Sequence, residues 1–176
     1  MIPDIVFLDR DGTLNRKAPE GAYVERPADV VLLPESAAAV RRLNELGVPV
    51  VVVSNQRGVA LGRMSEADVG EVNDAVASLL AREGAVVDSW LVCPHAADAC
   101  DCRKPGPGLL LAGLAARPGA RAERCVMLGD AETDMLAGRA AGMPGVLLAA
   151  RAPQRTVAAA VCRDLAAAVA WILRSP

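Results

Sequence analysis

The sequence predicts an α/β fold in which a parallel sheet carries helices on both faces. Short apolar runs, typical of buried strands, alternate along the chain with segments whose apolar residues recur every three or four positions, as in amphipathic helices. Polar residues directly follow most of the apolar runs, at the strand ends where open α/β sheets carry their chemistry. The chain contains no repeat or linker, so we expect one domain spanning residues 1–176.

The individual elements follow from the apolar patterns and from the glycines that end them. After a first strand that begins at Val6, we expect buried strands at 48–53, 86–92, 125–128 and 145–148. We expect helices at 35–46, 66–83, 108–116 and 132–141, with Ser65 as an N-cap.

The tail of the chain predicts one further amphipathic helix. Its apolar residues recur at spacings of three and four, and Cys162 lies among them. The residues of this pattern are Val157, Val161, Leu165, Val169 and Ile172. We expect this helix to pack on the sheet or on a second subunit.

Composition excludes several classes of function. Apolar residues make up 53% of the chain and aromatic residues only 2%, so the core must consist mainly of Ala, Val and Leu, with little aromatic surface for stacking bases. The net charge is −2 without a basic block, which favours neither nucleic acid nor membrane as a partner. No apolar run reaches the roughly 18 residues of a membrane span, and the N-terminus shows no signal peptide. We expect a cytoplasmic protein.

Two aspartates follow the first predicted strand. Asp9 and Asp11 are two residues apart in an extended segment, so both carboxylates should project into one crevice, with Gly12 turning the chain. Such a pair is costly without a cation or a proton, so either it shares a hard metal such as Mg²⁺ or one carboxyl is held protonated as an acid. Taken alone, Asp-x-Asp-Gly is also a common polar turn.

Polar residues lie at other strand ends as well. Ser54 follows the second strand, and Asp130 follows the strand at 125–128, with Asp134 four residues later. Lys104 is followed by Pro105, Gly106 and Pro107, and the prolines should make the loop rigid, so the ammonium group of Lys104 should have a fixed position. Each of these has an ordinary structural explanation by itself, as a turn, a helix cap or a surface charge.

Three cysteines lie close to the only histidine of the chain. Cys93 and His95 are separated by one residue, and Cys100 and Cys102 follow in the same pattern. Three thiolates and one imidazole form the closed donor set of structural zinc, without an open position for catalysis. A redox role is less favoured because no Cys-x-x-Cys is present.

The order DRDGT, Ser54, Lys104 and Asp130 resembles the four motifs of the haloacid-dehalogenase-like (HAD) phosphatases. The resemblance covers nearly the whole chain and implies a Rossmann-like HAD fold. It implies that Asp9 is a nucleophile, that Asp11 is a general acid and base, and that Ser54 and Lys104 hold the transferring phosphoryl group.

The same resemblance implies a Mg²⁺ site. Asp9, Asp130 and the backbone carbonyl of Asp11 would bind the ion, and Asp134 would support them from behind. A divalent cation and a fixed ammonium would offset the repulsion between the attacking carboxylate and the phosphate. The segments between the motifs leave no room for a cap domain, so the site should be open.

The zinc motif followed by CRKPGPG is similar to the D-glycero-D-manno-heptose 1,7-bisphosphate phosphatases and the related histidinol-phosphate phosphatases. YVERP, DRDGTLN and SNQ favour the heptose enzymes. The resemblance implies that Arg103 recognises substrate, and we expect further substrate contacts from Tyr23, Asn55, Gln56 and Arg57. Two features depart from the heptose group: the zinc segment is short, and Arg57 replaces a small polar residue.

We therefore expect a Mg²⁺-dependent enzyme with a structural Zn²⁺ that removes the C7 phosphate of heptose 1,7-bisphosphate through an aspartyl-phosphate. The alternatives are a histidinol-phosphate phosphatase and a catalytically inactive phosphosugar-binding or zinc scaffold protein. The expected partner is a small phosphosugar, and the chain is expected to act as a monomer.

Overall fold

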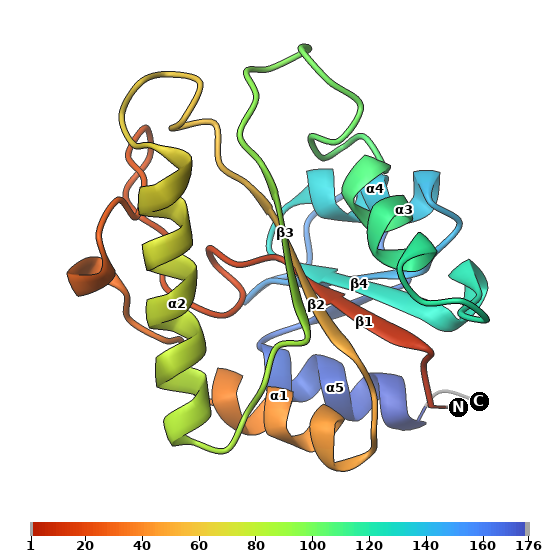
Figure 1. Cartoon of the computed structure of the whole chain (residues 1–176). Coiled ribbons are helices and arrows are strands. Elements are labelled where there is room, and N and C mark those ends of the chain that lie inside the picture. The colour runs from red at the N-terminus through yellow and green to blue at the C-terminus, as the bar shows by residue number, and fades with distance from the viewer. Residues whose placement is uncertain (1, 175–176) are drawn as a thin grey trace.

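The computed structural model describes residues 2–174, which form one parallel sheet between two layers of helices (Figure 1). The strand order is β3-β2-β1-β4-β5-β6, and every neighbouring pair is parallel. The strands are β1 Ile5–Leu8, β2 Val50–Asn55, β3 Ser89–Cys93, β4 Cys125–Gly129, β5 Gly145–Leu148 and β6 Ala160–Cys162. The fold is thus the predicted α/β class.

Helices connect all neighbouring strands in the chain except β5 and β6, which a loop joins, and they cover both faces of the sheet. The α-helices are α1 Ser36–Glu45, α2 Glu66–Arg82, α3 Gly108–Ala115, α4 Glu132–Ala140 and α5 Leu165–Arg174. Short 3₁₀ turns lie at Pro27–Asp29 (η1) and Ala122–Arg124 (η2). Ser65 accepts a hydrogen bond from the amide of Asp68 and closes a capping box at the start of α2, as predicted.

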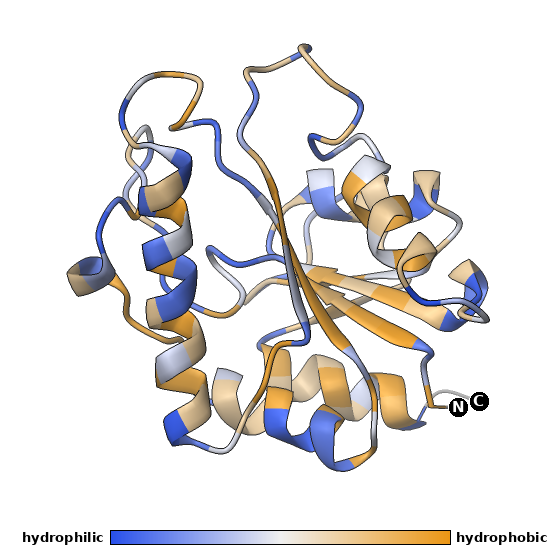
Figure 2. Ribbon diagram, in the orientation of Figure 1, coloured by the Kyte–Doolittle hydropathy of each residue, from blue (hydrophilic) through white to orange (hydrophobic). Residues whose placement is uncertain are grey.

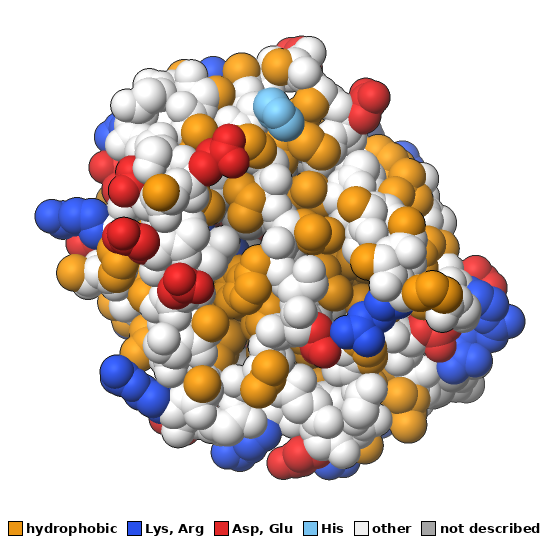
Figure 3. Space-filling view, in the orientation of Figure 1, with side chains coloured by type: hydrophobic (Ala, Val, Ile, Leu, Met, Phe, Trp, Pro, Cys, Tyr) orange, Lys and Arg blue, Asp and Glu red, His pale blue; other side chains and the backbone are white. Residues whose placement is uncertain are grey.

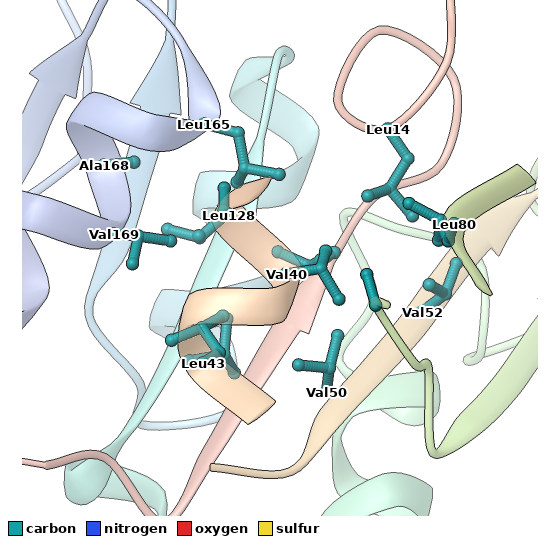
Figure 4. Close-up of a cluster of buried hydrophobic side chains, with 14 of the residues drawn as sticks. Leu14, Val40, Leu43, Val50, Val52, Leu80, Leu128, Leu165, Ala168 and Val169 are labelled. Carbon is teal, nitrogen blue, oxygen red and sulfur yellow. The ribbon is translucent and has the colours of Figure 1, made fainter. Parts of the chain in front are cut away.

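The larger core lies between the sheet and the helices α1, α2 and α5. Alternate strand residues such as Val50, Val52 and Leu128 point to this face. Figure 4 shows Val40 of α1 and Val169 of α5 gathered over them. The strands are continuously apolar because both faces are covered, as Figure 2 shows.

The intervening strand residues form a second core with α3 and α4. Phe7, the only phenylalanine of the chain, and Met127 lie on this face beside Leu110. Gly113 of α3 lies directly over Phe7, where a Cβ would overlap the ring. The absence of a side chain at this position lets α3 lie close to the sheet.

The tail prediction was wrong in its first half. Val161 pairs with Leu147 and Cys162 with Leu148, so these residues form an edge strand, and Cys162 is not in a helix. The helix begins only at Leu165, because Asp164 accepts a hydrogen bond from the amide of Ala167 and acts as its cap. The spacing of four between Val157 and Val161 was compatible with a helix, but the β-branched side chain of Val161 suits the open edge of the sheet, and Val157 lies in the loop before it.

The sheet reverses its direction of growth at β1. The chain passes from β1 to β2 on one side and later reaches β4 on the other, so the carboxyl ends of β1 and β4 border the crevice where such sheets bind ligands. Between β1 and β3, the described residues form η1, α1, β2, α2 and loops, with no separate cap domain. No helix within residues 2–174 is long and apolar enough to cross a membrane.

Candidate active site and zinc site

A tight turn at the end of β1 positions both aspartates. The amide of Asp9 donates to the carbonyl of Leu128 on β4, and the carbonyl of Arg10 accepts from the amides of Leu14 and Asn15. Gly12 has φ +95°, a conformation that favours glycine, and a Cβ there would overlap the carboxylate of Asp130. The turn therefore needs glycine to bring the ends of β1 and β4 together.

Lys104 is buried between the end of β1, strand β2 and α4. Its Nζ is 2.7 Å from Oδ1 of Asp9, 2.7 Å from Oδ1 of Asp134 and 2.7 Å from the carbonyl oxygen of Val53. Lys104 is only 3% exposed, so its three ammonium protons have three fixed acceptors. The ammonium is held by groups from three places: the end of β1, strand β2 and the first turn of α4.

The charges of this cluster depend on one another. Burial, with smaller contributions from Asp134 and Asp11, raises the pKa of Asp9 to about 7 against the lowering effect of Lys104. Burial alone would lower the pKa of Lys104, but Asp9 and Asp134 raise it above its usual value. One cation is thus shared by two buried carboxylates, which leaves the site short of positive charge.

A third carboxylate follows β4. Oxygens of Asp9, Asp130 and Asp134 lie within 4.8 Å of one another, so these carboxylates could hold one metal ion. The second oxygen of Asp134 accepts from the amide of Ala131 at the start of α4. Lys17 pairs with Asp130 from the solvent side.

The carboxylate of Asp11 is enclosed by hydrogen-bond donors and lies outside that group. Nε and NH2 of Arg10 donate to its two oxygens at 3.2 and 2.8 Å. The amides of Asn15 and Gln56 donate to Oδ1 and Oδ2 at 2.8 and 2.9 Å. Both aspartates lie directly after β1, but Asp9 faces Lys104 and Asp11 faces Arg10, Asn15 and Gln56, so a shared crevice for the two carboxylates stays a prediction.

The end of β2 supplies three polar side chains. The Oγ of buried Ser54 accepts from Gln56 at 2.8 Å, so Gln56 connects Ser54 to Asp11. The side chain of Asn55 donates to the carbonyl of Lys104 and accepts from its amide, which ties the β2 end to the lysine loop. Asn55 and Gln56, predicted as substrate contacts, thus also hold the site together.

The cysteines and the histidine form a second cluster, which joins the end of β3 at Cys93 to the returning end of the following loop at Cys102. Sγ of Cys93 lies 3.5 Å from Sγ of Cys100, which lies 3.2 Å from Sγ of Cys102. Nδ1 of His95 lies 3.6 and 3.3 Å from Cys93 and Cys102. Figure 3 shows the single histidine at the surface.

These distances suit a small tetrahedral metal centre. Zinc–ligand distances of about 2.0 to 2.3 Å give a tetrahedron with edges of about 3.3 to 3.8 Å. Burial would raise the pKa of Cys100, but hydrogen bonds from its neighbours lower it to about 6. Burial and the neighbouring thiols raise the pKa of Cys102 to about 12. A metal site of this kind needs its thiols deprotonated. The raised pKa of Cys102 opposes this while no cation is bound, so metal binding and proton release are coupled.

The other predicted specificity residues, Arg103, Arg57 and Tyr23, differ in exposure and contacts. Arg103 lies between Cys102 and Lys104, and its NH1 is buried without a hydrogen-bond partner among the described residues. Arg57 is exposed. Tyr23 is half-buried with the guanidinium of Arg63 over its ring at 5.8 Å, so it joins the loop after β1 to the loop after β2.

A cavity of about 650 Å³ adjoins Asp130, and Lys104 does not line it. It is lined in part by Gly12, Thr13, Arg16, Lys17 and Arg163. Asp130 therefore belongs to the carboxylate cluster and also lines this cavity.

Sequence reasoning missed the residues that support the site. Arg10, Asn15, Lys17 and Asn73 were not predicted to contact it. The position of Arg10 between the two aspartates was a signal for its proximity, since a buried strand end rarely carries an unpaired charge. Asn73 gave no local signal, because only the tertiary fold brings α2 against Arg10.

The comparisons with known proteins agree with this geometry. The HAD-hydrolase-like family model matches residues 101–168. The D-glycero-beta-D-manno-heptose-1,7-bisphosphate 7-phosphatase of Bordetella bronchiseptica is 33% identical over 97% of this chain and 98% of its own length. The alpha-anomer 7-phosphatase of Mycobacterium tuberculosis is 38% identical over 74% of this chain and 68% of its own.

Comparison of the fold with solved structures also finds heptose 1,7-bisphosphate phosphatases. The crystal structure of the B. bronchiseptica D,D-heptose 1,7-bisphosphate phosphatase, complexed with magnesium and phosphate, matches with a TM-score of 0.82 and 33% identity. The match covers 97% of this chain and 98% of that one. The chain belongs to the HAD-like hydrolases, in the family of the heptose-1,7-bisphosphate 7-phosphatases.

Proposed function

We propose that this protein is a Mg²⁺-dependent phosphatase that removes the C7 phosphate of D-glycero-D-manno-heptose 1,7-bisphosphate. The observation that carries the proposal is the buried Lys104 ammonium fixed between Asp9, at the carboxyl end of β1, and Asp134, in the first turn of α4 after β4. A cation buried beside a carboxylate nucleophile suits phosphoryl transfer, in which both must meet the same phosphate. Family membership supports the substrate class.

In this proposal Asp9 attacks phosphorus and becomes an aspartyl-phosphate. Lys104 and the hydroxyl of Ser54 hold the phosphoryl oxygens. Asp11 protonates the leaving alcohol and then takes a proton from the water that hydrolyses the intermediate. The hydrogen-bonded chain from Ser54 through Gln56 to Asp11 supports a common orientation of these groups.

Asp9, Asp130 and the carbonyl of Asp11 would hold Mg²⁺, with Asp134 supporting them. The fit rests on three clustered carboxylates facing one buried ammonium, a donor set of hard oxygens with surplus negative charge. Bound Mg²⁺ supplies charge stabilisation for the transferring phosphoryl group. Lys104 then also keeps Asp134 fixed behind the other two carboxylates.

Zn²⁺ in the cluster of Cys93, His95, Cys100 and Cys102 would have a structural role. Four protein donors close the coordination sphere, so no position remains for substrate. Cys102, Arg103 and Lys104 are consecutive residues. A zinc ion that orders the cysteine loop would therefore also hold Arg103 beside the site. The unpartnered NH1 of Arg103 supports a contact with substrate, such as the second phosphate.

Tyr23, Asn55, Gln56 and Arg57 remain the further substrate contacts that we propose. Their elements border the crevice, and exposed Arg57 offers a cation near its mouth. A cytoplasmic, monomeric protein of one domain, spanning residues 1–176, remains our prediction from the sequence.

The test is phosphate release in the presence of Mg²⁺ from the α and β anomers of heptose 1,7-bisphosphate, with histidinol phosphate in parallel. The named relatives act on different anomers, so both must be measured. We expect one heptose anomer to be hydrolysed fastest, and Asp9→Asn to abolish turnover while leaving the fold intact. Faster hydrolysis of histidinol phosphate would overturn the substrate, and no phosphate release from any of the three would favour an inactive binding or scaffold protein.

A further inference from the structure

Arg10 is a fully buried cation whose guanidinium grips the neighbouring Asp11. The side chain is 0% exposed, and Nε and NH2 bind the two carboxylate oxygens of Asp11 as a fork. A buried charge is costly unless its hydrogen bonds are satisfied. This buried charge lies next to Asp11, the residue that transfers protons in the proposed reaction.

The remaining terminal nitrogen of Arg10 is held from a distant element. NH1 donates to Oδ1 of Asn73 at 2.9 Å, and Asn73 is a buried residue of α2. The guanidinium is therefore fixed on one side by a helix that begins at a capping box and on the other by Asp11. It cannot rotate without losing one of these contacts.

Asp11 accepts four hydrogen bonds in this arrangement. Each oxygen has one donor from Arg10 and one side-chain amide, from Asn15 or Gln56. An ionised carboxylate offers about four acceptor positions, so all of them are used. To carry a proton toward a leaving group, Asp11 must give up its hydrogen bond from the side-chain amide of Asn15 or Gln56. The two hydrogen bonds from Arg10 can remain and keep the plane of the carboxyl group in place.

We propose that Arg10, held by Asn73, is the positioning residue of Asp11, a role that rests on the proposed function. In the first step an oxygen of Asp9 forms a bond to phosphorus and the bond from phosphorus to the alcohol oxygen breaks. The alcohol oxygen takes that electron pair and the proton of Asp11. Arg10 contacts neither the phosphorus nor the leaving oxygen; it acts through Asp11, whose O–H direction it fixes by binding both carboxyl oxygens.

A leaving-group comparison tests this role. An alkyl phosphate needs a proton on its leaving oxygen, whereas p-nitrophenyl phosphate loses a stable anion and does not. The ratio kcat/KM reports the steps up to the first irreversible one, here the formation of the aspartyl-phosphate. The alkyl substrate is the faster heptose 1,7-bisphosphate anomer, or histidinol phosphate if neither anomer reacts.

Arg10→Lys keeps the charge and removes the fork. We expect its kcat/KM for the alkyl phosphate to fall by about tenfold or more, with a change of less than about threefold for p-nitrophenyl phosphate. Asn73→Ala should show the same selectivity with a smaller fall, and Asn73→Asp, which keeps an acceptor for NH1, should restore the ratio. If Arg10→Lys does not fold, the comparison of Asn73→Ala with Asn73→Asp tests the proposal by itself.

Val69→Ala is the matched control. Val69 is buried on the same helix and lines the same small cavity as Asn73, so its truncation should cost stability without changing the ratio between the two substrates. Equal falls for both substrates in folded Arg10 or Asn73 variants would overturn the positioning role. Wild-type protein that hydrolyses p-nitrophenyl phosphate but no alkyl phosphate would overturn the proposed function and the acid role of Asp11 with it.

Discussion

Gly12 lies so close to Asp130 that the two residues leave no space for a Cβ between them. The contact joins the turn after β1 to the end of β4, and the positive φ of Gly12 makes it possible. Two carboxylates that we assign to Mg²⁺, Asp9 and Asp130, therefore owe their proximity to the absence of one side chain.

Gly12→Ala should displace Asp130 and weaken Mg²⁺ binding by tenfold or more, roughly the effect expected from disturbing a ligand or its immediate support. Calorimetric titration with Mg²⁺ measures this. Gly47→Ala is the control, because Gly47 also has a positive φ, +68°, but open space around its Cβ position. Both variants should lose about 1 to 2 kcal/mol from backbone strain. Equal Mg²⁺ affinity in the two would contradict the steric argument.

Lys104→Met should destabilise the protein at neutral pH. It leaves the buried carboxylates of Asp9 and Asp134 without their cation, and breaking a buried pair in this way costs about 3 to 5 kcal/mol. Chemical denaturation without Mg²⁺ measures the loss. For comparison, Arg117→Ala removes a half-exposed partner of Asp88 and should cost at most about 1 kcal/mol. A Lys104→Met protein as stable as Arg117→Ala would show that the cluster is not held by the ammonium.

The stability of the metal-free protein should fall as pH rises through the range in which Asp9 ionises. Burial raises the pKa of Asp9 from 3.8 to about 7, so between these values the folded state binds more protons than the unfolded state. The contribution of Asp9 is therefore fully present below its unfolded pKa and is lost as pH rises through about 7. Mg²⁺ must displace this proton, so its affinity should increase over the same range.

Denaturation in magnesium-free buffer at about pH 5 and about pH 7.5 measures this linkage. Asp9→Asn has no group to titrate at this position and should show a smaller pH dependence than the wild type. The same pH dependence in both proteins would mean that Asp9 is ionised throughout.

Protein purified without chelator should contain one zinc ion per chain, and Cys100→Ser should lose it. Loss of the metal should lower the melting temperature and phosphate release together, because Cys102 is separated from Lys104 by one residue. Cys162→Ser is the control, since Cys162 lies on the edge strand outside the cluster. Metal analysis that finds no zinc in the wild type would refute the assignment.

The sequence was sufficient for the elements whose patterns are local. The valine run of β2 and the capping box at Ser65 define their own structure, and α4 and β5 lie where their patterns indicated. The order of the motifs likewise predicts that Asp9, Lys104 and Asp130 lie together, since the carboxyl ends of parallel strands meet at one edge of the sheet.

The rest depends on contacts between distant segments. Whether Val161 belongs to a helix or a strand is decided by the open edge of β5, which no local pattern reveals. The link from Arg10 to Asn73 spans 63 positions and exists only because α2 packs behind the turn after β1. Supporting residues of this kind carry no spacing signal, whereas the residues they support do.

The loop that bears the cysteines is fastened at both of its feet. At one end the carbonyls of Cys93 and Pro94 accept from the amides of Gln56 and Ala60, and at the other the side chain of Asn55 clasps the backbone of Lys104. Changes of length confined to residues 96–99, between His95 and Cys100, would leave both of these attachments and the four cluster residues in place. The outer part of this loop can thus change shape while the contacts that hold the backbone of Lys104 stay the same.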